Sequence, residues 1–147
     1  MPIQDDADRR ILATLRQDSR ISNADLAERV GLSASSCWRR VRALEERGAI
    51  RRYTVDLDEA ALGLGFRAIV HVHLTRHDQA LVREFIRQIR TKDEVRACYA
   101  TTGASDYHLH VLCPDLDAYN RFLEDFLFSI PAVASAQTNL VLRTIKD

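Results

Sequence analysis

Apolar residues recur at helical spacing in the first third of the chain and at alternating spacing after residue 65. In the first third, Ile11, Leu12 and Leu15 lie within one turn or two of each other, which predicts a helix opened by Asp5 or Asp6. The later change of period indicates a switch from helices to a sheet.

Two further helices are predicted by a repeated start signal. Ile21 precedes Ser22, and Leu32 precedes Ser33, so each Ser can cap the first backbone N–H groups while the apolar residue packs onto the first turn. Gly31 lies between the two helices and supplies the permissive backbone that a tight turn needs. This arrangement is typical of a helix-turn-helix.

The second of these helices has one apolar and one cationic face. At 100° per residue, Cys37, Val41 and Leu44 share a stripe, and the opposite face is rich in Arg and Ser. Exposed Arg can donate paired hydrogen bonds to phosphates and guanine edges, so we predict major-groove DNA binding; the alternative is an ordinary solvated helix surface. The predicted DNA-binding residues are Ser22, Ser33, Ser35, Ser36, Trp38, Arg39, Arg40 and Arg42.

The chain leaves this helix at Gly48, a typical C-terminal cap. The residues that follow, from Ile50 to Leu57, lean toward a short strand and suggest a winged or wing-like module. A connector with Gly63 and Gly65 comes next. We therefore expect a helix-turn-helix domain over residues 1–52, a strand and linker over 53–65, and a second domain over 66–147.

The sequence pattern predicts the order βαββαβ for the strands and helices of the second domain. Alternating residues predict strands at about 66–75, 95–100, 107–112 and 134–142, with a helix opened by Asp78 and another over 119–130 that Pro131 stops. Right-handed crossovers then predict a ferredoxin-like sheet with both helices on one face, so the fold class is α+β. The open face predicts a homodimer, which would present two helix-turn-helix units to a pseudo-palindromic operator in double-stranded DNA.

Composition and charge are compatible with this interpretation. The 147 residues are 46% hydrophobic and 29% charged, as in globular domains, and carry no net charge. Residues 1–52 have 11 Arg against eight acidic residues, a net charge of +3, while the rest of the chain has a net charge of −3. The three cysteines show no zinc spacing, and we see no export signal or membrane span, so we expect a cytoplasmic protein.

The sequence resembles the Lrp/AsnC, or feast/famine, family of transcription factors. The resemblance covers nearly the whole chain and implies an N-terminal domain that reads DNA and a C-terminal domain that senses amino acids or related metabolites. It also implies homodimers, which often assemble into octamers. Its motifs are Asp8-Arg9-Arg10-Ile11-Leu12, Gly31-Leu32-Ser33, Cys37, Arg40-Val41, Leu44-Glu45, Gly48-Ala49-Ile50, Thr102-Gly103-Ala104-Ser105-Asp106-Tyr107, Pro114-Asp115, Tyr119 and Ile130-Pro131-Ala132-Val133.

The same resemblance implies an effector pocket at the turn between the second and third strands. Gly103 allows close backbone approach, exposed N–H groups can hold a carboxylate, and Asp106 can bind an α-ammonium group. The alternative is that Gly103 and Asp106 only form a tight turn. The predicted effector-binding residues are Thr101, Thr102, Gly103, Ala104, Ser105, Asp106 and Tyr107, and no other cofactor is expected.

Four histidines depart from the polar residues that relatives tend to carry. His71 and His73 share one strand face, and His108 and His110 share a face of the strand predicted beside it. These imidazoles could bind a transition metal or titrate at a dimer interface. Cross-strand hydrogen bonding is the simpler interpretation, and we expect no metal site.

Other classes of protein find less support. An enzyme is not indicated, because the sequence has no Gly-rich phosphate loop and no nucleophile elbow, and Asp106 beside Tyr107 lacks a third catalytic group. A DNA-architectural protein of the same fold, without an effector, remains an alternative.

Overall fold

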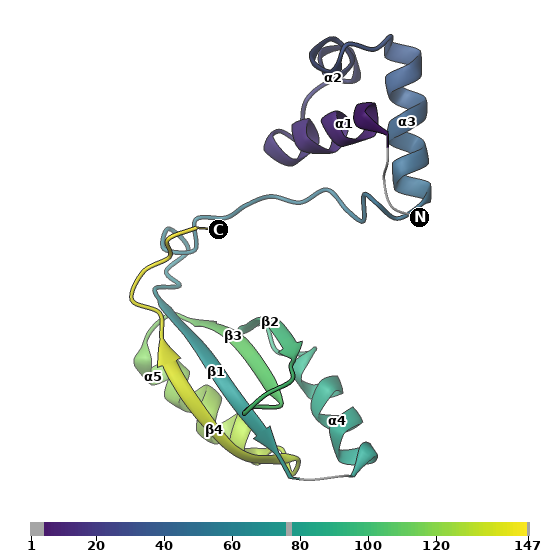
Figure 1. The fold of residues 1–147 in the computed structure, drawn as a ribbon. Coiled ribbons are helices and arrows are strands. Elements are labelled where there is room, and N and C mark those ends of the chain that lie inside the picture. The colour runs from purple at the N-terminus through teal and green to yellow at the C-terminus, as the bar shows by residue number, and fades with distance from the viewer. Residues whose placement is uncertain (1–4, 76–77, 147) are drawn as a thin grey trace. The chain divides into compact units, whose positions relative to one another are not determined.

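The computed structural model of the chain describes residues 5–75 and 78–146. It divides into two compact units, Met1–Leu57 and Asp58–Asp147 (Figure 1). None of the helices within the described residues is long and apolar enough to cross a membrane.

Unit 1 contains three helices, α1 (Asp6–Gln17), α2 (Asn23–Val30) and α3 (Ala34–Glu46). All three predicted start signals are confirmed, because side chains of Asp5, Ser22 and Ser33 accept hydrogen bonds from backbone N–H groups of the first turns. Gly31 ends α2 in the left-handed conformation, with φ of 70°, which a residue with a Cβ adopts at a cost. The three helices enclose a core of Ile11, Leu26, Ala27, Val30, Cys37 and Leu44.

The strand expected after α3 is not formed. Residues 51–58 belong to no helix or strand, and Tyr53, Val55 and Leu57 are 50%, 70% and 57% exposed. The prediction was wrong because β-propensity describes how a residue fits a paired, half-buried surface, and a strand without a neighbour leaves its backbone groups unpaired.

Unit 2 is a four-stranded antiparallel sheet with helices. Its strands lie in the order β2-β3-β1-β4, with antiparallel pairing throughout. This confirms the predicted α+β class and the predicted pairing of β1 with β3, which are the two central strands. The elements are β1 (Phe66–Leu74), α4 (Gln79–Ile89), β2 (Val95–Ala100), β3 (Tyr107–Cys113), α5 (Leu116–Arg121) and β4 (Val133–Leu140).

The core of unit 2 lies between one sheet face and the helices. Val70 and Val72 of β1 are buried together with Phe85 of α4 and Tyr119 of α5, so α4 and α5 cover the same face. Register places His71 of β1 with the residues of the opposite face, which no helix covers. The sequence alternation of β1 is therefore explained by one helix-covered and one open face.

The helix predicted over residues 119–130 is irregular in its second half. A π-helical turn (Phe122–Phe126) and a 3-10 turn (Leu127–Ser129) follow α5. A π turn places residues five apart on one side, and Phe122 and Leu127 are both buried in the core. The apolar spacing therefore accounts for the widened turn.

Candidate nucleic-acid interface and effector loop

Helix α3 displays a cationic face opposite its buried stripe. Cys37 and Leu44 are fully buried, whereas Ser35, Arg39 and Arg42 are exposed. The Ser33 cap and the packing of the buried stripe fix the helix on the domain. The face that carries these exposed side chains therefore has a fixed orientation relative to the domain. This is the geometry that a recognition helix needs.

The exposed arginines differ in how far their charges are already paired. Arg39 forms no ion pair with any residue in ranges 5–75 and 78–146. The Arg42 guanidinium lies 5.8 Å from the Trp38 ring centroid, and its Nη1 is 3.7 Å from Glu45 Oε2 at the protein surface. Trp38 itself is 58% exposed, which is unusual for so large an apolar side chain. Arg39, Trp38 and Arg42 therefore form a continuous patch that solvent reaches.

Arg40 lies on the same helix, but its charge is already paired with carboxylates of α1 and its N-cap. Its Nη1 donates to Asp5 Oδ2 at 2.7 Å and to Asp8 Oδ1 at 2.8 Å. Asp8, which is only 5% exposed, also accepts from Arg47 Nη2 at 3.3 Å. These carboxylates raise the pKa of Arg40, and the Arg40 guanidinium lowers the pKa of Asp5. The charge of Arg40 thus ties α3 to α1, a link that periodicity does not reveal because the residues are 32 to 35 positions apart.

The remaining predicted residues of this interface lie at the helix starts. Ser22 Oγ accepts from Asp25 N–H at 3.1 Å and donates to Asp25 Oδ2 at 2.7 Å. Ser33 Oγ accepts from Ser36 N–H at 3.3 Å. Ser22 and Ser33 are exposed, and Ser36 is half-buried. The two capping hydroxyls already have partners, so their first role is structural.

Replacement of Ser33 by Ala is expected to lower the free energy of unfolding by about 1 kcal/mol, because the Ser36 N–H loses its side-chain acceptor. Chemical denaturation followed by circular dichroism measures the loss. Ser33→Thr keeps a hydroxyl and should retain most of the stability. Equal losses in both variants would show that the hydroxyl cap contributes nothing.

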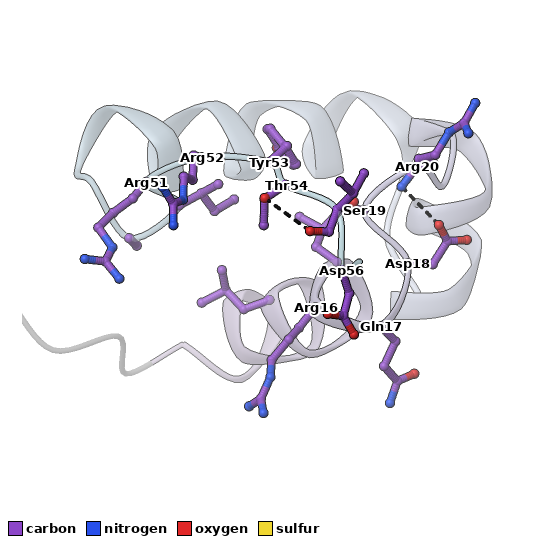
Figure 2. Close-up of a pocket in the computed structure, with 15 residues that line it drawn as sticks. Arg16, Gln17, Asp18, Ser19, Arg20, Arg51, Arg52, Tyr53, Thr54 and Asp56 are labelled. Atoms are coloured by element: carbon purple, nitrogen blue, oxygen red, sulfur yellow. Dashed lines mark hydrogen bonds between the residues drawn. The ribbon is translucent and has the colours of Figure 1, made fainter. Parts of the chain in front are cut away.

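A groove of about 750 Å³ lies elsewhere in unit 1, between the end of α1 and the segment after α3. Figure 2 shows Arg16, Arg20 and Arg51 extending outward from it, and Arg52 also lines it. Tyr53 lines the groove and is held by a hydrogen bond, which its hydroxyl donates to Glu45 Oε1 at 2.9 Å. Burial and then this contact raise the pKa of Tyr53. The groove adds four basic side chains to the surface of the helical unit, and sequence spacing did not indicate it.

The predicted effector loop connects β2 to β3 and is held at its base. Thr101 N–H donates to Asp106 O at 3.0 Å, and Thr101 Oγ donates to Ser105 O at 3.1 Å. Gly103 has φ of 124°, and a Cβ there would meet no atom within 4 Å. Thr102, Gly103 and Ala104 are exposed, so the tip offers backbone groups at a position that favours glycine.

Asp106 has a structural contact as well as an exposed carboxylate. Its Oδ2 accepts from Leu74 N–H at 2.8 Å, and its own N–H donates to Val72 O at 3.0 Å. Both contacts join the loop to the end of β1. The neighbouring Tyr107 is half-buried, and burial, with the nearby Cys98 and Asp106, raises its pKa. The carboxylate keeps further acceptor capacity for a ligand.

The four histidines do not gather at one point. His71 Nδ1 and His108 Nδ1 are 2.6 Å apart, and the Asn139 side-chain amide is 3.0 Å from His71 Nε2. His73 instead lies 3.4 Å from Ser105 Oγ, and His110 packs edge-on against Tyr99. The described part of the chain contains no group of three or more residues that could hold a metal ion.

Comparison with known proteins gives the two units a family context. A winged helix-turn-helix DNA-binding family matches residues 4–51, and the Lrp/AsnC ligand binding domain matches residues 67–147. The chain belongs to the Lrp/AsnC family. As a member, it is a DNA-binding transcriptional regulator whose C-terminal domain binds an effector, as its resemblance to the family implied.

Relatives that match this Lrp/AsnC chain over nearly its full length are transcriptional regulators. The HTH-type transcriptional regulator AldR of Mycolicibacterium smegmatis is 41% identical over 142 residues, covering 97% of this chain and 83% of the relative. The leucine-responsive regulatory protein of Escherichia coli is 35% identical over 143 residues, covering 97% and 87%.

A solved structure resembles this Lrp/AsnC chain almost throughout. It is the transcriptional regulator NMB0573 of Neisseria meningitidis in complex with L-Met, with a TM-score of 0.95 and 35% identity. The match covers 99% of this chain and 94% of that one.

Proposed function

We propose that this regulator binds a pseudo-palindromic operator as a homodimer and inserts α3 of each copy into the major groove. The exposed cationic face of α3 carries the proposal. Arg39 and Arg42 provide the forked donors that suit guanine edges and phosphates, beside the hydroxyls of Ser35 and Ser36. A two-fold protein would present two such helices to successive turns of DNA.

The other predicted residues of the interface receive supporting roles. Trp38 offers an exposed apolar edge for thymine methyl groups or sugars beside Arg42. Ser22 and Ser33 contribute by holding the two helix starts. Arg40 is a positioning residue, because its Nη1 already binds Asp5 and Asp8 and thereby sets α3 against α1.

We further propose that an amino acid binds at the loop over Thr101–Tyr107 and changes DNA binding or assembly. The backbone around Gly103 can approach a carboxylate closely, and the exposed Asp106 carboxylate can bind an α-ammonium group. The L-Met complex of the Neisseria relative supports an amino-acid ligand for this domain.

The homodimer is supported by the sheet of unit 2. Its helices cover one face, and the other carries half-buried His71 and His108 among the polar residues of β4. An isologous contact would cover the open face in both copies at once.

A screen of the twenty amino acids is expected to find at least one that raises the thermal stability of the protein, because a ligand that binds the folded state stabilises it. The same ligand should shift the midpoint of an operator titration followed by fluorescence of Trp38, the only Trp in the chain. Asp106→Asn can still accept from Leu74 N–H, so it should keep the fold while weakening the ligand about tenfold.

Asp93→Asn, in the exposed turn before β2, is the matched control for the loss of one negative charge. An operator binder that responds to no amino acid would instead support the effector-independent architectural protein. A chain that fails to bind DNA at all would overturn the proposed function.

A further inference from the structure

We propose that His71 and His108 form one half of a binding site for a divalent transition metal ion, and that a second copy of this chain completes it. The inference rests on the homodimer proposed above. Imidazole nitrogen is a favoured ligand of zinc, nickel and copper, and two imidazoles already meet in one chain.

The geometry of the pair is close to that of a chelate. His71 and His108 are directly opposite each other on neighbouring antiparallel strands, and their rings meet edge to face with centroids 4.7 Å apart. The two Nδ1 atoms are 2.6 Å apart. Two nitrogens bound to one tetrahedral zinc ion, each at about 2.0–2.1 Å, are about 3.3 Å apart. The two Nδ1 atoms must therefore move apart by about 0.7 Å and turn their lone pairs toward the ion to bind it.

The close approach of the two nitrogens requires a proton or a cation between them. Two neutral imidazoles repel each other if both Nδ1 atoms present lone pairs, so in the absence of a metal one Nδ1–H must donate to the other. The Asn139 amide can donate to His71 Nε2 in that state. When a metal replaces the shared proton, that proton moves to His71 Nε2, and a 180° rotation of the Asn139 amide turns its oxygen toward Nε2 to accept it. Asn139 thus supplies the outer hydrogen bond that orients a metal-bound histidine.

The position of the pair explains why a second copy is needed. The pair lies on the two central strands of the sheet, on the face that α4 and α5 leave open. In each chain His71 and His108 supply two ligands there, and no group among the described residues reaches three. An isologous dimer through this face brings the same two imidazoles from the other copy, and four nitrogens satisfy tetrahedral zinc.

The test is calorimetric titration of the full chain with ZnCl₂, paired with sedimentation equilibrium with ZnCl₂ or EDTA. We expect one Zn²⁺ to bind per two chains. We also expect the dissociation constant of the dimer to be at least about tenfold lower with ZnCl₂ than with EDTA. His71→Gln and His108→Gln should each abolish both effects. His110→Gln is the matched control, because His110 lies on the same strand and face as His108 but packs against Tyr99. This variant should retain both effects. Circular dichroism checks that every variant is folded.

Three results would overturn the site: no Zn²⁺ binding by the wild-type chain, binding that survives both His71→Gln and His108→Gln, or binding that disappears in Cys98→Ser. The last would assign the ion to the exposed thiol of β2 instead. Operator titrations in EDTA separate this inference from the proposed function. A dimer that binds operator in EDTA but takes no Zn²⁺ refutes only the metal site, whereas a chain that stays monomeric under all conditions refutes the homodimer and the shared site together.

Discussion

The double variant Arg39→Ala/Arg42→Ala is expected to weaken operator binding by on the order of a hundredfold or more. Each guanidinium that contacts a base or phosphate contributes roughly 1 to 3 kcal/mol, and both side chains are exposed on the face of α3 opposite Cys37 and Leu44. Anisotropy of a labelled operator, measured at several salt concentrations, gives the affinity. The slope of log affinity against log salt should become shallower by the number of lost phosphate contacts.

The matched control removes the same charge from another part of unit 1. This control is Arg16→Ala/Arg20→Ala, because both residues line the groove between α1 and the segment after α3. It should change operator affinity far less than Arg39→Ala/Arg42→Ala does. The single variants separate two roles, because the Arg that reads a base should relax sequence preference, whereas the Arg that contacts phosphate should weaken all sequences alike. If both double variants lose affinity equally and without loss of sequence preference, α3 is not the recognition helix.

Features set by short-range chemistry could be predicted from the sequence. A Ser followed by a helical run places its acceptor near the first N–H groups wherever the rest of the fold lies, which is why the starts at Ser22 and Ser33 agree with the structure. The alternation of β1 likewise required one buried and one open face. Strand order followed because few connections satisfy a right-handed βαββαβ chain.

Features that depend on distant partners could not be predicted. Arg40 lies on the flank of the cationic face, but its partners Asp5 and Asp8 come from another helix. The apolar alternation around Val55 resembles a strand, yet none of the strands formed by residues 5–75 and 78–146 pairs with it. Among the four histidines, only His71 and His108 meet, because register sets them directly opposite each other and leaves His73 beside the effector loop.

Replacement of Asp8 by Ala is expected to lower the free energy of unfolding of unit 1 by about 2 to 3 kcal/mol. Asp8 is buried and accepts from both Arg40 and Arg47, so its removal leaves two guanidinium groups without a shared acceptor. The loss should stay below that of a fully broken buried pair because Arg40 keeps Asp5. Urea denaturation followed by Trp38 fluorescence reports this unit specifically, since Trp38 is the only Trp.

Asp6→Ala is the matched control, because Asp6 is an exposed carboxylate of the same helix whose ion pair with Arg10 lies at the surface and should contribute little. Arg40→Ala completes a double-mutant cycle with Asp8→Ala, and a coupling energy of at least about 1 kcal/mol is expected for residues in direct contact. If Arg40 positions α3 and does not contact DNA, Asp8→Ala and Arg40→Ala should weaken operator binding by similar factors. The affinities are compared under conditions in which both variants are fully folded. A loss of affinity confined to Arg40→Ala, with Asp8→Ala binding like the wild type, would instead place the Arg40 guanidinium on the DNA.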